Sequence, residues 1–346
     1  MHVPFLYNRS ADDPAHAAED EFPARSPVVA ALKQLGHMVT PIACTLDLAK
    51  VRQRLLRVKP DVVFNRVESL GGSDGMMAAV TLLLDSMRIP YTGSCTAALV
   101  ATASKIVVKE KLVDAGLPTP CWLGGDAPAR CDKTARVTAA GRFIIKSVFE
   151  HASFEIDDAS IVGPASEEEI QELVRERELR SGRCHFAEEF IDGREFNISV
   201  MGEPPLVLPP AEIDFSLFPS DKARIVGHIA KWDETSFEYN STERLFEFPT
   251  SDAPLLRELT DLTIRCWRLF GLTGYARVDF RCDAEGRPWI LEVNTNPCIM
   301  PEAGFATALE YAGIGYDGGL QRILDDAVAR SSAGLVNRER LAAIDG

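Results

Sequence analysis

Several features that would define common classes of protein are missing from this 346-residue sequence. None of its eight cysteines forms a CxxC pair, which argues against a zinc ribbon or a thioredoxin-type redox site. No apolar run approaches the ~20 residues that span a bilayer. The N-terminus has neither the basic region nor the long apolar region of a signal peptide. We therefore expect a reduced, cytoplasmic protein with free thiols.

An excess of positive charge is also missing, since the formal net charge is −14. Nucleic acids and membrane surfaces require a basic face, so we expect neither as a partner. No GxGxxG motif follows an expected strand, which argues against a Rossmann dehydrogenase. A nucleotide is not excluded, because a phosphate site needs only a few local cations and backbone N–H groups.

What is present is an ordinary globular composition, with 46% hydrophobic and 25% charged residues, in a chain long enough for two or three compact units. Over residues 1–94, strands and helices alternate around a Gly-rich loop at 70–75. This rhythm predicts an N-terminal α/β domain with a parallel sheet. The expected strands are 39–42, 61–65 and 89–93, and the expected helices are 27–35, 46–56 and one that ends near residue 87.

Two α+β units are expected to follow. The first, residues 95–190, has a Lys-rich helix at 104–116, a strand at 143–148, a helix at 167–179 and a strand at 185–191. The second, residues 191–346, has a strand at 194–200, a polar stretch at 211–248 and a helix at 253–270. The polar stretch is compatible both with a substrate lid and with a solvated insertion.

The most informative segment is a hairpin at 275–297 with a turn at 283–286. If Cys282 and Arg287 close the turn, alternation along each strand sorts the side chains onto two faces. The predicted apolar face carries Ala276, Val278, Phe280, Trp289, Leu291 and Val293. The predicted opposite face carries Arg277, Asp279, Ile290, Glu292 and Asn294.

The opposite face of this hairpin gathers two carboxylates, an amide oxygen and a guanidinium. Hard cations such as Mg²⁺ prefer oxygen ligands, mostly carboxylates, together with substrate phosphates. Asp279, Glu292 and Asn294 supply such ligands, and Arg277 is placed to stabilise charge that develops on a phosphoryl group or an oxyanion. A solvated face of an ordinary hairpin would show the same pattern, so the residues alone leave both interpretations open.

The stretch from Arg277 to Pro297, with its Leu-Glu-Val-Asn-Thr-Asn-Pro run, resembles the metal-binding end of ATP-grasp enzymes. The nearest group is the D-alanine–D-alanine ligases. Other segments resemble motifs of that family in the same order along the chain. They are the loop at 70–75, the strand at 88–94, Ser104-Lys105 with residues 112–120, Ile144-Ile-Lys146, residues 187–196, and Ala230-Lys231-Trp232.

The resemblance implies an ATP-grasp fold in which ATP lies between two antiparallel sheets, preceded by a parallel α/β domain. It assigns Lys105 and Lys146 to phosphate oxygens, and Lys231 to the γ-phosphate from a loop that closes over it. The assigned adenine-binding segment is Glu188, Glu189, Phe190 and Ile191, and the assigned ribose ligand is Glu195.

The resemblance also implies a reaction. Mg²⁺, or Mn²⁺ in its place, would be held by Asp279, Glu292 and Asn294 while a substrate carboxylate attacks the γ-phosphorus. An amine would then attack the acyl phosphate, with Arg277 and Lys231 as catalytic groups. The implied partners are small amino-acid-type molecules and a second copy of the chain in a homodimer.

Departures from the family pattern fall at substrate positions. Glu68 stands where the family has His, Trp232 where it has Tyr, and Ala152 where it has Ser. Cys298 and Ala303 replace a Gly and the acceptor-binding Ser. We therefore expect a ligase for amino acids other than D-alanine with D-alanine. A true D-alanine–D-alanine ligase, an ester- or thioester-forming enzyme and a non-catalytic ATP-binding protein are the alternatives.

Two of these substitutions suggest specific roles. Glu68 would suit a cationic group on the first substrate, although a carboxylate in a solvated loop is an equally ordinary interpretation. Cys298 could be a nucleophile, but a small packed residue in place of Gly is the more ordinary interpretation.

Overall fold

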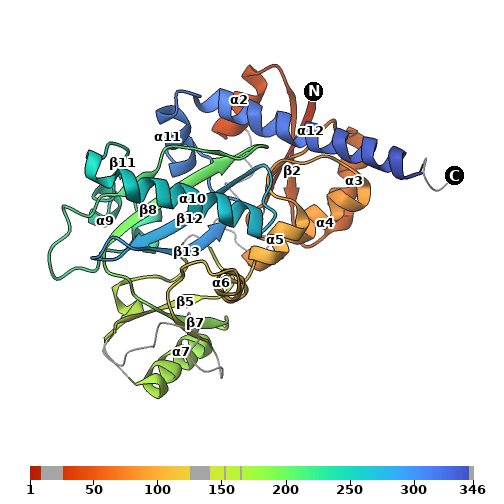
Figure 1. The fold of residues 1–346 in the computed structure, drawn as a ribbon. Coiled ribbons are helices and arrows are strands. Elements are labelled where there is room, and N and C mark those ends of the chain that lie inside the picture. Colours follow the sequence, from red (N-terminus) through yellow and green to blue (C-terminus); the bar gives the residue numbers. More distant parts are fainter. Residues whose placement is uncertain (9–25, 125–140, 152, 164–165, 343–346) are drawn as a thin grey trace.

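A computed structural model describes residues 1–8, 26–124, 141–151, 153–163 and 166–342 (Figure 1). Three sheets organise these residues, one within each of the three predicted ranges. The mixed α/β and α+β class predicted from the sequence is confirmed. The boundaries near residues 94 and 190 stay predictions.

The N-terminal sheet is parallel, with the order β2-β1-β3. Its strands are β1 (His2–Asn8), β2 (Met38–Cys44) and β3 (Phe64–Arg66). Its helices are α2 (Pro27–Gln34), α3 (Leu48–Val58) and α4 (Ala78–Met87), with a 3₁₀ turn η2 (Asp74–Met76) in the Gly-rich loop. Ser26 and Pro27 begin α2 as expected.

The observed strands of this sheet differ from the expected ones at two places. Strand β1, the central strand, was not among the expected strands. The expected strand at 89–93 is reduced to a single bridge between Tyr91 and Val63. Pro90 has no N–H to extend a ladder, and Gly93 turns the chain away with a φ of 89°.

The central sheet is antiparallel, with the order β4-β7-β5-β6. It comprises β4 (Trp122–Gly124), β5 (Phe143–Ser147), β6 (Ile161–Val162) and β7 (His185–Glu189). Helix α7 (Glu167–Ser181) covers one face with Ile170 and Val174. Helices α5 (Thr96–Thr102) and α6 (Lys105–Asp114) and the turn η3 (Asp158–Ser160) complete this part.

The C-terminal sheet follows the order β11-β10-β8-β12-β13, and β9 also pairs with β8. Its strands are β8 (Arg194–Met201), β9 (Leu206–Val207), β10 (Ala211–Ile213), β11 (Arg244–Leu245), β12 (Tyr275–Cys282) and β13 (Pro288–Asn294). Helix α10 (Ala253–Leu269) packs Leu259, Leu262 and Cys266 against it. The remaining helices are α8 (His228–Trp232), α9 (Phe237–Asn240), α11 (Gly304–Tyr311) and α12 (Tyr316–Ala342).

The predicted register of the β12–β13 hairpin is wrong at the turn, because Cys282 pairs with Pro288 instead of Arg287. This shift sets Ile290 opposite Phe280, so Ile290 is a fully buried core residue instead of a member of the polar face. A β-bulge follows, since Asp279 pairs with Glu292 and Leu291 has no partner, and it returns Glu292 to the predicted face. Trp289 and Leu291 correspondingly fall outside the core cluster that they were expected to join.

One apolar core joins the two ends of the chain. Val3 and Phe5 of β1 and the buried face of α2 share a cluster with α11 and α12. In Figure 1, α12 runs beside α2 along the upper edge, while the central sheet with α7 lies below the sheet of β8, β12 and β13. The C-terminal helices therefore clamp the first sheet onto the third.

Two features concern the expectation of a reduced, cytoplasmic protein: the state of the cysteine thiols and the apolar character of the helices. Six described cysteines are free thiols, whereas Cys121 is disulfide-bonded, so the expectation of free thiols is wrong at that position. No helix in the described residues combines the length and apolar character needed to cross a membrane. The cytoplasmic location stays a prediction.

Candidate active site

Strand β12 provides the centre of the site. Its pairing with β8 sets three residues opposite one another in turn: Arg277 with Ser199, Asp279 with Asn197, and Arg281 with Glu195. Its pairing with β13 sets Arg277 opposite Asn294 and Asp279 opposite Glu292. Residues directly opposite each other point to the same face of an antiparallel sheet, so all of these side chains share one face. The predicted grouping of Arg277, Asp279, Glu292 and Asn294 is confirmed despite the bulge.

Arg277 and Asp279 form a two-pronged ion pair. Nε donates to Oδ1 at 2.6 Å and Nη2 to Oδ2 at 2.8 Å, and Asn197 Nδ2 donates to Oδ1 at 2.9 Å. Burial alone would lower the pKa of Arg277, but the Asp279 and Glu292 carboxylates raise it. Arg277 is therefore a permanently charged, well-oriented guanidinium.

Glu292 is held by a residue of the loop that follows β5. The ring Nδ1 of His151 pairs with Glu292 Oε1, and the backbone N–H of His151 donates to Asp74 at 2.7 Å. Burial alone would raise the pKa of Glu292, but Lys105, His151 and Lys231 hold it well below its usual range. Asp74 and His151 thus bring the Gly-rich loop and the central unit against the C-terminal sheet.

The residues of the predicted metal site fit a hard cation bound together with phosphates. Asp279 and Glu292 are cross-strand neighbours of like charge, an arrangement that needs a cation between or beside the two carboxylates. Arg277 pairs with Asp279, and the His151 ring contacts Glu292. Within the described ranges no three His, Cys, Asp or Glu side chains form a metal cage by themselves. Substrate phosphates would have to complete the shell, as is usual for Mg²⁺.

Lys105 and Lys146 come from the central α+β unit, on α6 and β5. Lys105 begins α6 and its ammonium donates to the carbonyl of Glu150, while Lys146 on β5 pairs with Glu188 on β7. Burial lowers the pKa of Lys105. Lys105 is also close enough to Glu292 and to Lys146 for their charges to act on its pKa.

A third lysine was missed by sequence reasoning. Lys109, one turn after Lys105, is fully buried, lies 2.5 Å from Glu188 and donates to Thr119 Oγ1 at 2.8 Å. Burial lowers its pKa to about 8. Its spacing of four residues from Lys105 was the available signal, since both then share one face of a helix. Glu188 thus forms ion pairs with two lysines, Lys109 and Lys146.

The predicted adenine segment is tightly held. The N–H groups of Glu189 and Phe190 donate at 2.8 Å to the carbonyls of Cys121 and Arg142. The Phe190 ring lies between two guanidinium groups, those of Arg142 at 4.8 Å and Arg281 at 5.7 Å from its centroid. A nucleotide base bound at residues 188–191 would therefore hydrogen-bond to backbone groups other than these two N–H groups.

Arg281 is a second residue that sequence reasoning missed. It pairs with Glu195 at 2.8 Å and donates to Gly193 O at 3.2 Å, beside Ile191. Its position two residues after Asp279, on the same face, was the signal. Arg281 therefore fixes the carboxylate that the resemblance assigns to ribose.

Lys231 reaches this face from α8. Burial and the nearby charge of Arg277 lower its pKa, while Glu292, Asp279 and Glu195 act in the opposite direction. Ser153 Oγ donates to Val226 O at 2.6 Å, and His228 N donates to Ile156 O at 2.9 Å. The segment with Lys231 is thus tied to the loop of the central unit.

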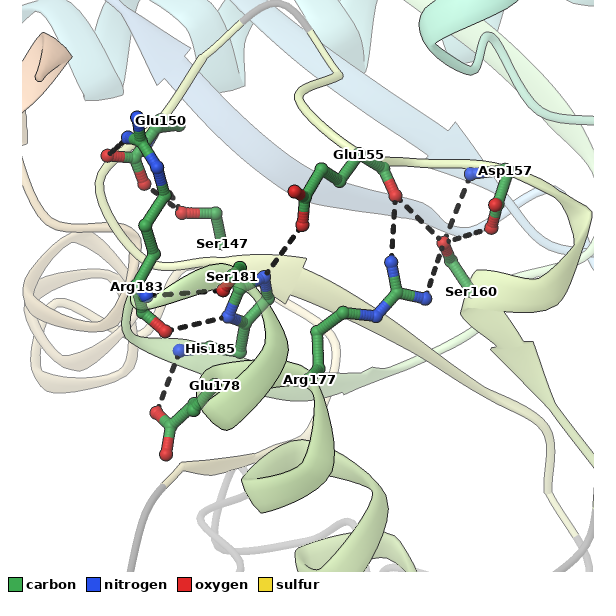
Figure 2. A network of polar contacts seen from close by, with 10 residues as sticks. All are labelled: Ser147, Glu150, Glu155, Asp157, Ser160, Arg177, Glu178, Ser181, Arg183 and His185. Atoms are coloured by element: carbon green, nitrogen blue, oxygen red, sulfur yellow. Dashed lines mark hydrogen bonds and ion pairs between the residues drawn. The ribbon is translucent and has the colours of Figure 1, made fainter. Parts of the chain in front are cut away.

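A network of polar contacts from α7 and the start of β7 holds the loop between β5 and β6 in place (Figure 2). Arg183 pairs with Glu150, and its Nη2 also donates to Gly72 O in the Gly-rich loop at 2.9 Å. Arg177 of α7 donates to Glu155 O at 3.1 Å and to Ser160 Oγ at 3.4 Å. The loop between β5 and β6 is therefore positioned by charged contacts at both ends.

The structure describes only some of the residues that depart from the family pattern. Glu68 pairs with Arg66 at 2.6 Å and keeps 43% of its side chain exposed. Cys298 is an exposed free thiol. Ala152 and the side chain of Trp232 lie outside the described residues.

Comparison with known proteins agrees with this geometry. A family model for the "D-ala D-ala ligase C-terminus" matches residues 143–325. A D-alanine–D-alanine ligase of Gloeobacter violaceus is 31% identical over 307 residues, covering 86% of this chain and 91% of that protein. Another, from Methylococcus capsulatus, is 30% identical over 315 residues, covering 90% and 93%.

The solved structure of D-alanine–D-alanine ligase from Bacillus anthracis complexed with ATP superposes with a TM-score of 0.69 at 20% identity. The match covers 96% of this chain and 99% of that one, which establishes the ATP-grasp fold. Fold and site define an ATP-dependent, ADP-forming carboxylate–amine ligase. The chain belongs to the D-alanine–D-alanine ligase family.

Proposed function

We propose that the protein activates the carboxylate of one amino acid as an acyl phosphate and joins it to the amine of a second. The observation that carries the proposal is that Arg277, Asp279 and Glu292 share one face of the sheet and that Lys105 and Lys231 lie close enough to lower the pKa of Glu292. Preorganised charges of this kind act where charge develops in phosphoryl and acyl transfer.

For the substrate pair we propose D-alanine with D-alanine. The names of the curated relatives favour this pair over the expectation of a different amino acid. The ion pair of Glu68 with Arg66 supports the revision, because a carboxylate that already has a cationic partner is a poor receptor for a cationic substrate.

The protein groups would act as follows. Lys105, Lys146 and Lys231 bind phosphate oxygens and orient the γ-phosphorus toward the first carboxylate. Closure of α8 excludes water from the acyl phosphate. Arg277 stabilises the oxyanion that forms when the amine attacks. Mg²⁺ held by Asp279, Glu292 and Asn294 would neutralise phosphate charge during transfer.

The adenine and ribose contacts are part of the same proposal. Glu188, with the backbone of Glu189, Phe190 and Ile191, would bind adenine, and Glu195 would accept hydrogen bonds from the ribose. The support is that ion pairs orient both carboxylates. Lys109 and Lys146 pair with Glu188, and Arg281 pairs with Glu195. A cytoplasmic homodimer stays an expectation that sedimentation of the purified chain would check.

The test is phosphate release from Mg·ATP with D-alanine, other single amino acids and pairs of amino acids. Release that requires D-alanine, with D-alanyl-D-alanine found by mass spectrometry, supports the proposed pair. Asp279→Ala and Arg277→Ala should each lower kcat about 10²-fold or more. Release with another pair would restore the alternative of a different amino-acid ligase, and absence of release with every pair would overturn the proposal.

A further inference from the structure

Arg281 makes contacts with three separate parts of the chain on the nucleotide side of the site. It is 4% exposed and lies on β12 directly opposite Glu195 of β8. Its Nη1 donates to Gly193 O at 3.2 Å and lies 3.5 Å from Ile191 O, and its Nη2 pairs with Glu195 Oε2 at 2.8 Å. Nη2 also donates to Arg224 O, in the chain that leads to α8. One buried guanidinium therefore joins the segment after β7, the carboxylate of Glu195 and the chain before α8.

A row of aromatic rings continues from Arg281 into the segment 214–241, which carries α8 and α9. The Cζ atom of Arg281 lies 5.5 Å from the centroid of Phe215, within the range of a cation–π contact. The Phe215 ring packs edge-on against Phe218 with 5.1 Å between centroids. Phe218 lies 5.5 Å from Phe237 of α9. The position of Arg281 is thus linked to the packing of this whole segment.

The carboxylate of Glu195 has one oxygen left for a ligand. Its Oε2 pairs with Arg281, whereas no residue in the described part of the chain donates a hydrogen bond to Oε1. The side chain is 14% exposed, so little water replaces the missing donor. A hydroxyl group that donates to Oε1 would form a charge-assisted hydrogen bond with a carboxylate that Arg281 already orients.

We propose that Arg281 is a positioning residue that couples recognition of the nucleotide ribose to closure of the segment 214–241. The inference rests on the proposed function, in which Glu195 binds the ribose and Lys231 covers the γ-phosphate. A ribose hydroxyl that donates to Glu195 would hold the carboxylate against Arg281, and Arg281 would hold the carbonyl of Arg224. A nucleotide without ribose hydroxyls would bind more weakly and would also leave the segment less closed, so that water reaches the acyl phosphate.

The experiment compares Mg·ATP with Mg·2′,3′-dideoxy-ATP, which lacks both ribose hydroxyls, at saturating D-alanine. The wild-type enzyme should have a kcat/KM about 10–100-fold higher with ATP, the range expected of hydrogen bonds to a charged group. With dideoxy-ATP it should release more phosphate than it forms dipeptide, whereas with ATP the two amounts should be equal. Titration calorimetry of both nucleotides measures the ribose preference without turnover.

Variants of Arg281 and its neighbours separate the two effects. Arg281→Met should raise the KM for ATP, leave that for dideoxy-ATP unchanged, and raise the ratio of phosphate to dipeptide with ATP. Arg281→Lys keeps a charge beside Glu195 and should restore part of the preference for ATP. Phe215→Leu removes only the ring contact, so it should raise the ratio and leave the preference intact. Arg287→Met, at the exposed turn of the same hairpin, is the matched control, with both quantities unchanged.

Two results would overturn the inference. An equal loss with ATP and dideoxy-ATP in Arg281→Met would limit Arg281 to the stability of the fold. Equal amounts of phosphate and dipeptide from the wild-type enzyme with dideoxy-ATP would show that the ribose does not act on closure. This second measurement needs no variant, so it decides the matter even where Arg281→Met does not fold.

Failure of the proposed function would give a different result. The wild-type enzyme would then release no phosphate with any amino-acid pair, although it would still bind nucleotide. Calorimetry would in that case still test the action of Arg281 on Glu195, because the preference for ATP over dideoxy-ATP should be present in the wild-type protein and lost in Arg281→Met.

Discussion

Lys109 shows how a single buried charge organises the nucleotide side of the site. It belongs to α6, pairs with Glu188 at 2.5 Å, makes a cation–π contact with Trp122 at 5.5 Å, and donates to Pro120 O at 3.1 Å. A lysine that is fully buried is costly unless its donors have partners, and here Glu188, Thr119 and Pro120 provide them. The pair with Glu188 therefore links α6 to the central sheet.

The first prediction concerns this pair. Lys109→Met should destabilise the protein by about 3 kcal/mol, the low end for a broken buried pair because Lys146 still neutralises Glu188. It should also raise the KM for ATP, since Glu188 loses its orientation. Urea unfolding and ATP titration measure both effects, and Lys111→Met on the exposed side of α6 is the control. Loss of stability with an unchanged KM would limit Lys109 to a structural role.

The second prediction concerns acid. Burial alone would raise the pKa of Glu188, but Lys109 and Lys146 hold it below its ordinary 4.5 in the folded state. The folded state then binds fewer protons than the unfolded state, so the contribution is full above pH 4.5 and is lost as the pH falls through the folded pKa. Glu188→Gln should flatten the fall in stability below pH 4.5. The exposed Glu176→Gln should follow the wild-type curve; if both variants do so, the ion pair is not the cause.

The residues found from the sequence and those missed differ in a physical way. Asp279, Glu292 and Lys146 could be predicted because strand alternation and an apolar surrounding mark a charge as unusual. Lys109 and Arg281 share a face with predicted site residues, but their roles depend on carboxylates 79 and 86 positions away. Only folding brings such partners together.

At the scale of elements, a lysine adds to the contacts that hold the segment with α8 and α9 against the central unit. Lys222 pairs with Asp158 of η3 at 3.0 Å and with Glu238 of α9 at 2.7 Å. These residues line a cavity of about 240 Å³ that Ile229 and Ala230 of α8 also border. The ion pairs of Lys222 therefore contribute to the position of the segment that carries Lys231.

The third prediction follows from these ion pairs. Lys222→Ala should loosen the segment and admit water, so that ATP is hydrolysed without formation of a peptide bond. Partly exposed ion pairs are worth about 0.2–1 kcal/mol each, so the ratio of phosphate released to dipeptide formed should rise only a few-fold. Lys59→Ala, at the end of α3, is the control. A ratio that stays at one would show that closure does not depend on Lys222.

The hairpin shows the limit of pattern reasoning for elements. Strict alternation placed Ile290 on the polar face, but a turn shifted by one residue sets Ile290 opposite Phe280 in the core, and the bulge at Leu291 keeps Glu292 and Asn294 on the site. Alternation fixes faces only where the ladder is regular, and one extra residue reverses it. The long helices α7 and α10 were found within two residues of their ends because their caps and periodicity are local.

At the scale of the whole molecule, two glycines set the distance between the first and third sheets. A Cβ on Gly274 would stand 2.5 Å from Gly93 O, and Gly274 has a φ of 70°. Ser94 Oγ donates to Thr273 O at 2.9 Å, and Arg330 of α12 donates to Gly93 O at 3.0 Å. This seam leaves no space for a side chain.

The fourth prediction tests the seam. Gly274→Ala should destabilise the protein by about 2 kcal/mol or more, because a positive φ and a backbone clash act together. Gly271→Ala has a similar φ of 60° but meets nothing within 4 Å, so it isolates the backbone strain. Urea unfolding of both variants gives the difference. Equal losses would mean that the two sheets can separate slightly at no cost.

The core that joins β1 and α2 to α11 and α12 also has a consequence for synthesis on the ribosome. The apolar side of α2 is translated early, yet Leu320, Ile323 and Leu324, which cover it, emerge almost 300 residues later. A nascent chain carries this bare surface throughout elongation, a state that favours aggregation and chaperone capture. The first α/β unit therefore cannot bury this surface until α12 has been synthesised. A stalled or truncated chain would leave the apolar side of α2 exposed to solvent.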